Sequence, residues 1–289
     1  MTIKCFTVAT HIDGYYDILL QSCKRNNINI HVLGKGEKYI NHLFKTYKTI
    51  EFLKKQKSDQ IVLFIDGFDS IVLENINKIE KEFLKLKLPF VFSQDIKYNY
   101  YKNLALKFFI KINSTNNYIF NNLLTISRPC FLDSKYTYIN SGLFIGYSKY
   151  LLKIFEKSLN FVKYYNHNSN QRLLQDMCNE KTKIFVDSKN VIFHNFSHRD
   201  KIKFKNKKIY INNKKSCIIS KPGLGDLSTI ALYLKYDISF IKKRNLLLYY
   251  LGGSNKRTVL FVFIVNILFL LIFLKISKMY YMKYSLNSK

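Results

Sequence analysis

The chain has 289 residues, enough for one large domain or two small ones, and its 48% hydrophobic and 16% aromatic content excludes wholesale disorder. The formal net charge of +28 is typical of proteins that bind nucleic acid or anionic membranes, but the lysines are spread along the whole chain among Asn, Ile, Tyr and Phe. This spread favours composition bias over selected basicity. Because the chain has no Arg-rich helix or zinc-finger pattern, we expect no specific nucleic-acid partner. The five cysteines contain no CxxC pair, which argues against a disulfide scaffold and a structural zinc site.

Strand-like and helix-like segments alternate in the first third of the chain. The predicted strands are residues 4–10, 28–34, 61–66 and 89–93. The predicted helices are residues 14–26, 40–55 and 76–86. This order predicts an α/β domain with a largely parallel sheet, in which ligands bind outside the carboxyl ends of the strands.

The second half of the chain is less regular. Residues 136–148 form a strand-like segment, and residues 151–165 and 170–180 have amphipathic helical spacing. Two further strands are predicted, at residues 183–188 and 216–220. Residues 229–257 form a basic, aromatic connector.

The C-terminal segment 258–274 has no charged side chain. A helix of this length spans about 25 Å, the thickness of a thin bilayer core. A buried core helix is the alternative, but the flanking Lys256, Arg257 and Lys275 favour a membrane span. We therefore expect a large domain at 1–235, a basic juxtamembrane segment at 236–257, a span at 258–274 and a short basic tail at 275–289. The N-terminus shows no secretory signal, which favours a tail anchor with the large domain in the cytosol.

The stretch IVLFIDGFDSIVL, residues 61–73, ends a buried strand in two carboxylates, Asp66 and Asp69. An acidic turn after a strand is the simpler interpretation. The alternative is a shared divalent cation, because carboxylates are hard oxygen ligands suited to Mn²⁺ or Mg²⁺. The position at the carboxyl end of a predicted strand favours the metal site.

The stretch YINSGLFIGY, residues 138–147, places Gly142 and Gly146 inside a predicted strand. Glycine within a strand marks a bulge or a close approach of another backbone or ligand. Asn140 and Ser141 provide polar groups beside the first glycine. A core strand whose glycines are needed only for packing remains the alternative.

Seven segments in the same order resemble the glycosyltransferase domain of the procollagen lysyl hydroxylases. The segments are VAT…DG (8–14), VLGKGE (32–37), IVLFIDGFDSIVL (61–73), FVFSQD (90–95), YINSGLFIGY (138–147), NQRLL (170–174) and FVDSKNVIFHNF (185–196). Together they cover roughly residues 3–235. Relatives of that family include collagen-type galactosyltransferases and giant-virus homologues. The resemblance implies a GT-A-type fold that uses a UDP-sugar with Mn²⁺.

The resemblance also implies roles for individual residues. Asp66 and Asp69 match the family's metal-binding acidic pair. Residues matched to the nucleotide or donor sugar are Val8, Ala9 and Thr10 at the first strand edge, Asn140, Ser141 and Gly142 on the strand facing the sugar, and Ser93, Gln94 and Asp95 in a nearby loop. A basic residue on the helix before the acidic strand usually contacts the nucleotide, and the register leaves Lys45 and Lys48 as candidates.

Two segments depart from the family pattern. Ser169-Asn170-Gln171 stands where the family has Asp-Asp-Gln, so Asn170 keeps hydrogen-bonding capacity without the charge, and Asn170 and Gln171 are the candidate catalytic residues together with Asn140. Ser220, in CIISKPGLGD (217–226), stands where the family has its metal-binding histidine. The resemblance then leaves water to complete the metal's coordination. It gives Lys221 and Gly223 as candidates for binding the nucleotide, with Lys221 contacting the diphosphate. His194 and His198 are alternative ligands, although a histidine in such a position is more often structural.

The leading hypothesis is a membrane-anchored, Mn²⁺-assisted hexosyltransferase acting on an acceptor hydroxyl, with hydroxylysine of a collagen-like protein as the family's acceptor. The alternative is a catalytically impaired relative that acts as a membrane-associated binding or scaffold protein. The departures at Asn170 and Ser220 favour this alternative, and the intact Asp66 and Asp69 disfavour it. A third hypothesis, a basic protein that binds polyanions, is supported by the net charge alone.

Overall fold

A computed structural model of the chain describes residues 3–95, 130–132, 135–165, 169–179, 182–197, 200–206, 208–223, 225–239 and 241. Residues Met1–Phe240 form one compact unit. Its strands are β1 (Lys4–Val8), β2 (Ile30–Leu33), β3 (Ile61–Ile65), β4 (Ser70–Val72), β5 (Phe90–Gln94), β6 (Cys130–Leu132), β7 (Lys135–Thr137), β8 (Ile139–Tyr147), β9 (Val186–Asp187), β10 (Phe193–Asn195), β11 (Ile202–Lys205), β12 (Lys208–Ile211) and β13 (Ile218–Ser220). Its helices are α1 (Tyr16–Arg25), α2 (Leu43–Lys54), α3 (Ile76–Leu86), α6 (Ser148–Tyr165), α7 (Asn170–Asn179) and α8 (Ser228–Tyr233).

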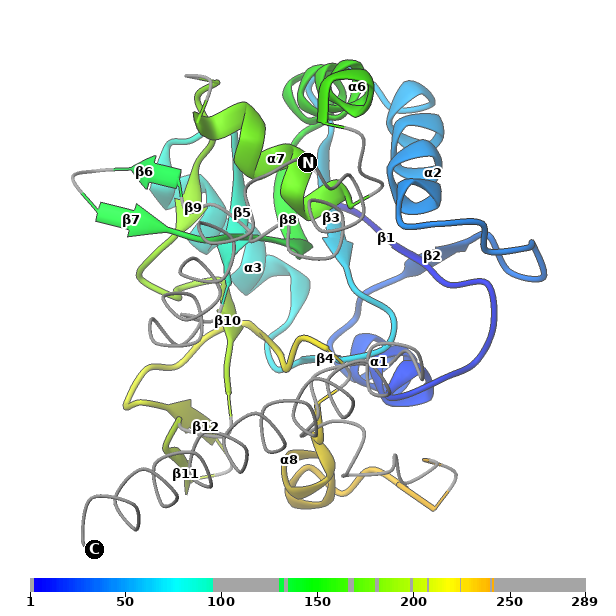
Figure 1. Ribbon diagram of the computed structural model, residues 1–289. Helices are drawn as coiled ribbons and strands as arrows, with labels where there is room; N and C mark the ends of the chain where they lie inside the picture. The colour runs from blue at the N-terminus through cyan, green and yellow to red at the C-terminus, as the bar shows by residue number, and fades with distance from the viewer. Residues whose placement is uncertain are drawn as a thin grey trace, which may run out of the picture. The chain divides into compact units, whose positions relative to one another are not determined.

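The central sheet has six strands in the order β2-β1-β3-β8-β5-β9 (Figure 1). β1 pairs in parallel with β2 and β3, and β5 pairs in parallel with β9. β8 runs antiparallel to both of its neighbours, β3 and β5. The expectation of a largely parallel sheet is therefore confirmed. The reversed direction of β8 has a functional consequence, because its N-terminal end lies at the carboxyl ends of β3 and β5.

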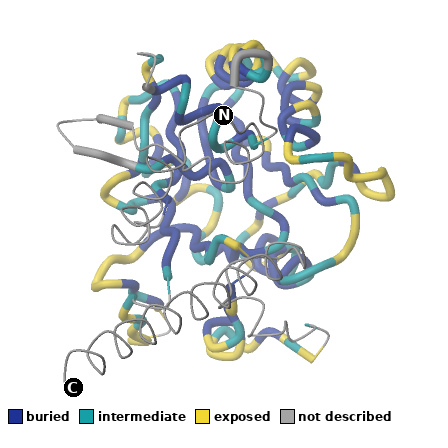
Figure 2. The backbone as a smooth tube through the Cα atoms, in the orientation of Figure 1, coloured by how far each residue is buried: buried dark blue, intermediate teal, exposed yellow. Residues whose placement is uncertain are grey.

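Helices cover both faces of this sheet. β3 shows how, because Val62 and Phe64 point into one core cluster while Ile61, Leu63 and Ile65 point into another. The first cluster lies under α2, α6 and α7, and contains a run of phenylalanine rings in which Phe64 stacks on Phe144 at 4.8 Å. The second lies against α1, α3 and the smaller sheet. Figure 2 shows this buried interior, with exposed residues along the outer surfaces of the helices.

The smaller sheet has three strands in the order β10-β13-β4. β4 begins directly after the Asp66–Asp69 turn, and Ser70 pairs with Ser220 of β13. The chain thus brings a segment from beyond residue 216 next to the end of β3. The sequence predicted β13 but not β4, β10, the hairpin of β11 and β12, or α8.

The fold class expected from the sequence is corrected in one respect. No helix of the described residues is long and apolar enough to cross a membrane. α6 is the longest described helix, and Lys149, Lys153, Glu156 and Lys157 make it amphipathic rather than apolar on every face. The predicted span at 258–274 and tail at 275–289 lie outside the described residues. The described chain is an α/β domain without a membrane-spanning helix.

Candidate functional site

The turn after β3 holds Asp66 at the carboxyl edge of the sheet. Its Oδ2 atom accepts a hydrogen bond from Lys45 Nζ at 2.8 Å, and its Oδ1 atom accepts one from the backbone N–H of Phe68 at 3.3 Å. Lys45 lies in the first turn of α2. Lys48, one turn further along, instead contacts Glu37 and Glu51 at 2.7 and 3.5 Å. Of the two lysines proposed from the sequence, the structure thus places Lys45 at the acidic turn.

Asp69 lies deeper in the protein than Asp66, with 8% of its surface exposed. Its Oδ1 atom accepts a hydrogen bond from Ser220 Oγ at 3.0 Å, and its carbonyl oxygen accepts one from the backbone N–H of Lys221 at 3.0 Å. The side chain of Lys221 turns away, because its Nζ donates to the carbonyl of Asp226. Gly223 has φ +83°, which suits glycine in this turn. Ser220 therefore lies beside Asp69, one of the two carboxylates matched to the family's acidic pair.

The edge of β1 packs against the same turn. Val8 is the last residue of β1, and Ala9 and Thr10 continue toward residues 34–36 through backbone hydrogen bonds to Leu33 and Gly36. A side chain added at Gly67 would lie 3.5 Å from the Ala9 methyl group. These expected nucleotide-binding residues thus border the acidic turn through backbone and small side chains.

A second polar group lies where β8 begins and β5 ends. Asn140 accepts hydrogen bonds through Oδ1 from the backbone N–H of Gly142 at 2.7 Å and from Ser93 Oγ at 3.3 Å. Its Nδ2 atom donates to Asp95 Oδ1 at 3.4 Å, and Gln171 Nε2 donates to Asp95 Oδ2 at 2.8 Å. Asp95 is 6% exposed. Burial and these two amide donors hold its carboxylate in one orientation.

Asn170 connects the first turn of α7 to the same strand end. Its Oδ1 atom accepts a hydrogen bond from Ser141 Oγ at 3.2 Å. Its Nδ2 atom is buried and has no hydrogen-bond partner among the described residues. A buried amide without a partner is unfavourable by about 1–3 kcal/mol, so a ligand that accepts this hydrogen bond gains from it.

Sequence reasoning missed Asn195 as a member of this site. Its Nδ2 atom donates to Ser93 Oγ at 3.1 Å and to the Gln94 carbonyl at 2.8 Å. Its Oδ1 atom is buried without a partner in the described part of the chain. The available signal was the stretch FHN, a buried strand whose last residue is a polar amide, much as the polar Asp66 directly follows β3.

Two basic side chains act on His42, and one of them, Lys45, contacts Asp66. The pKa of His42 is lowered by burial and then by the positive charges of Lys45 and Arg172, which places both cations near that imidazole. The pKa of Tyr39 is raised by burial and by the negative charge of Asp66. The corner therefore combines carboxylates with basic side chains, an arrangement suited to a ligand that brings both metal and phosphate.

The oxygen atoms of Asp66, Asp69 and Ser220 fit a hard divalent cation such as Mn²⁺ or Mg²⁺. Within the described ranges, no group of three or more His, Cys, Asp and Glu side chains is placed to hold a metal ion. A metal held by Asp66 and Asp69 would thus have two carboxylate ligands, and its other positions would be left to water or substrate. His194 is 3% exposed and belongs to no such group. His198 lies outside the described residues.

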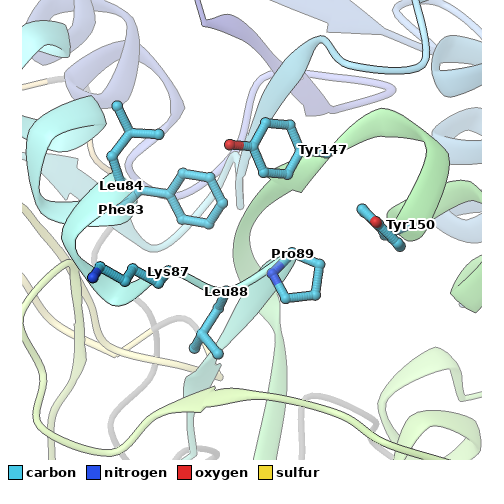
Figure 3. Close-up of a pocket in the computed structure, with 7 residues that line it drawn as sticks. All are labelled: Phe83, Leu84, Lys87, Leu88, Pro89, Tyr147 and Tyr150. Atoms are coloured by element: carbon cyan, nitrogen blue, oxygen red, sulfur yellow. The ribbon is translucent and has the colours of Figure 1, made fainter.

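A pocket of about 430 Å³ lies elsewhere, lined by Phe83, Leu84, Lys87, Leu88, Pro89, Tyr147 and Tyr150 (Figure 3). Tyr147 pairs with Ile61 at the start of β3, whereas Asp66 follows the end of that strand. The pocket is therefore at the opposite edge of the sheet and shares no residue with the acidic turn. It gives no support to any of the predicted site residues.

The described chain is thus an α/β domain with a mixed sheet, one reversed strand and an acidic turn at the carboxyl edge. The sequence profile of the PLOD GT domain, the glycosyltransferase domain of lysyl hydroxylases, matches residues 1–222. The chain belongs to this family and is a glycosyltransferase. Proteins of this kind use nucleotide-sugar donors, usually with a divalent metal, and transfer the sugar to a glycan or protein acceptor.

Two solved structures show the extent of the likeness outside the family match. The galactosyltransferase LgtC, solved with donor and acceptor sugar analogues, is 12% identical with a TM-score of 0.43, covering 76% of this chain and 87% of its own. A glycosyltransferase involved in glycosylation of the major capsid of PBCV-1 is 11% identical with a TM-score of 0.44, covering 76% and 93%. These scores are too low to carry an argument, so the assignment rests on the family match. No curated protein matches the chain.

Proposed function

We propose that the chain transfers a hexose from a UDP-sugar to an acceptor hydroxyl with the help of Mn²⁺ or Mg²⁺. The observation that supports this proposal is the acidic turn after β3, in which Asp66 pairs with Lys45 and Asp69 accepts a hydrogen bond from Ser220. Asp66 and Asp69 would hold the metal. When bound, such a cation neutralises a diphosphate and stabilises the negative charge on the departing nucleotide.

Other residues of the site would contact different parts of the donor. The β1 edge at Val8, Ala9 and Thr10 borders the nucleotide, and Lys45 supplies positive charge for the diphosphate. The backbone N–H of Lys221 fixes Asp69. These groups bind and orient the donor before reaction, which is the main protein contribution in transfers of this type.

The sugar faces the hydrogen-bonded group of Ser93, Asp95, Asn140 and Gln171, with Asn170 and Ser141 beside it. Asp95 is the one carboxylate in this set, and its fixed orientation suits it to accept hydrogen bonds from sugar hydroxyls. In the transfer, the acceptor oxygen bonds to the anomeric carbon, the bond from that carbon to the diphosphate breaks, and the acceptor proton is released. The family suggests hydroxylysine of a collagen-like protein as the first acceptor to test.

A catalytically impaired donor-binding protein is the second candidate. Asn170, where the family has an aspartate, and Ser220, where it has a histidine, favour this candidate. It predicts UDP binding with Mn²⁺ but no transfer or donor hydrolysis with any tested hexose.

The deciding experiment measures UDP release from UDP-galactose and UDP-glucose by the full-length chain, with Mn²⁺ and with excess chelator. We expect UDP release that needs the metal and is lost in Asp66→Asn and Asp69→Asn. Asp59→Asn is the matched control, because Asp59 is exposed in the loop before β3. Absence of UDP binding by calorimetry at saturating Mn²⁺ would refute both candidates.

A further inference from the structure

The ammonium group of Lys45 already occupies the carboxylate that a metal would use. Lys45 Nζ lies 2.8 Å from Asp66 Oδ2, and the two side chains are only 22% and 24% exposed. The same Nζ lies 5.1 Å from the centre of the Phe64 ring, which adds a cation–π contact. Partial burial weakens the screening of this ion pair by water. Another cation that binds Asp66 Oδ2 would therefore compete with Lys45 for this oxygen.

The surroundings of Asp66 restrict where a second cation can bind. Oδ1 faces the backbone N–H of Phe68. A divalent ion arriving alone would meet, at Oδ2, an oxygen already paired with the ammonium group of Lys45. Like charges at such short range oppose each other.

We propose that Lys45 is an exchangeable cation that couples metal binding at Asp66 to binding of the donor diphosphate. The inference rests on the proposed function and concerns the order in which its ligands bind. Without the nucleotide, Lys45 competes with the metal for Asp66. The diphosphate offers Lys45 an alternative anionic partner, so its arrival releases Asp66 to the metal. Metal and nucleotide then bind cooperatively, and metal alone binds weakly.

Lys48 provides a matched control on the same helix. It is separated from Lys45 by one helical turn and pairs with Glu37 and Glu51 rather than with Asp66. Its removal takes away the same charge from α2 without freeing the Asp66 carboxylate. Comparing the Lys48 and Lys45 variants therefore separates the general effect of removing a positive charge from the loss of competition at Asp66.

The test titrates Mn²⁺ into the full-length chain and follows free Mn²⁺ by electron paramagnetic resonance, with and without UDP. We expect Lys45→Met to bind Mn²⁺ alone about tenfold more tightly than the unchanged chain, a size typical of couplings between ligands. UDP should strengthen Mn²⁺ binding strongly in the unchanged chain and in Lys48→Met, but much less in Lys45→Met. In the Asp66→Asn background, Lys45→Met should no longer increase Mn²⁺ affinity.

The outcomes separate this inference from the proposed function. If UDP binds with Mn²⁺ but Lys45→Met leaves the affinity for Mn²⁺ alone unchanged or weaker, the exchange is refuted and the proposed function stands. If UDP binds to no variant at any Mn²⁺ concentration, the proposed function fails and the exchange fails with it. Lys45→Gln is a second variant judged by the same criteria, and circular dichroism checks that each variant is folded.

Discussion

Alanine at Gly146 is expected to disrupt the centre of the sheet. A Cβ atom there would lie 2.3 Å from Phe90 Cβ, 2.7 Å from Phe90 Cα and 2.9 Å from the Pro89 carbonyl oxygen. Carbon atoms in contact are normally about 3.5–4.0 Å apart, so the overlap exceeds roughly 1 Å. Two of these atoms belong to the backbone and cannot rotate away, so β5 and β8 must separate. We expect Gly146→Ala to lower the free energy of unfolding by about 3 kcal/mol or more.

Alanine at Gly142, in the same strand, should act on the site instead. The nearest atoms are Asn140 Oδ1 at 2.8 Å and Asp66 Oδ2 at 3.5 Å, which belong to side chains that can move. Moving Asn140 breaks its hydrogen bond to the Gly142 N–H, so the loss of stability should be about 1 kcal/mol. Because the displaced side chain of Asn140 belongs to the candidate site and the new methyl group would contact Asp66, UDP-sugar affinity should fall at least about tenfold, or roughly 1.4 kcal/mol.

Urea unfolding and calorimetry of UDP-sugar binding with Mn²⁺ measure the two effects on the same samples. Gly142→Ala serves as the stability control for Gly146→Ala, because both add one methyl group to β8. Stability of Gly146→Ala within about 1 kcal/mol of the unchanged chain would refute the close approach of β5 to β8. Unchanged donor affinity in Gly142→Ala would show that the donor does not bind at the corner of Asn140 and Asp66.

Three further predictions concern buried groups. Burial lowers the pKa of His194 from 6.5 to about 4, so stability is lost as pH falls from 6.5 to 4, and His194→Gln should flatten that loss in urea unfolding at several pH values. Asp187→Ala should lower unfolding free energy by about 3 kcal/mol, and Asp187→Asn by less, because three backbone N–H groups of residues 191–193 donate to this carboxylate. Tyr15→Phe should speed proteolysis near residues 221–228, since the Tyr15 hydroxyl contacts Asp226, Leu227 and Ser228; an unchanged cleavage rate would contradict this.

Elements held by local patterning were predicted well. The apolar spacing of α3 gave Ile76–Leu86 without error, and the continuous apolar run at 61–66 gave the buried strand β3, which ends one residue earlier, at Ile65. β4, β10 and α8 were missed because they are short and their pairing or packing partners lie far away in the chain. β4, for example, has three residues and pairs with β13, about 150 positions later. The pattern of residues within such a short segment does not indicate which distant strand it pairs with.

The sequence indicated candidate site residues, but it did not indicate which of them contact one another. The resemblance gave Asp66 and Asn140 as site candidates and put Ser220 in place of the family's metal-binding histidine, and the structure adds that Ser220 is hydrogen-bonded to Asp69. Whether Lys45 or Lys48 faced the acidic turn could not be decided, because both lie on one helix and the answer depends on how α2 packs. Asn195 was missed because its role depends on contact with Ser93, about 100 residues earlier.

The reversed strand β8 also constrains how the chain folds. β3 and β5 never pair with each other, and each has β8 as its neighbour on one side. A nascent chain that has emerged only as far as residue 95 therefore exposes unpaired edges on two strands made of apolar residues. Such edges are prone to intermolecular pairing until residues 139–147 arrive. Fragments that end before β8 should accordingly associate with one another rather than form a stable half of the domain.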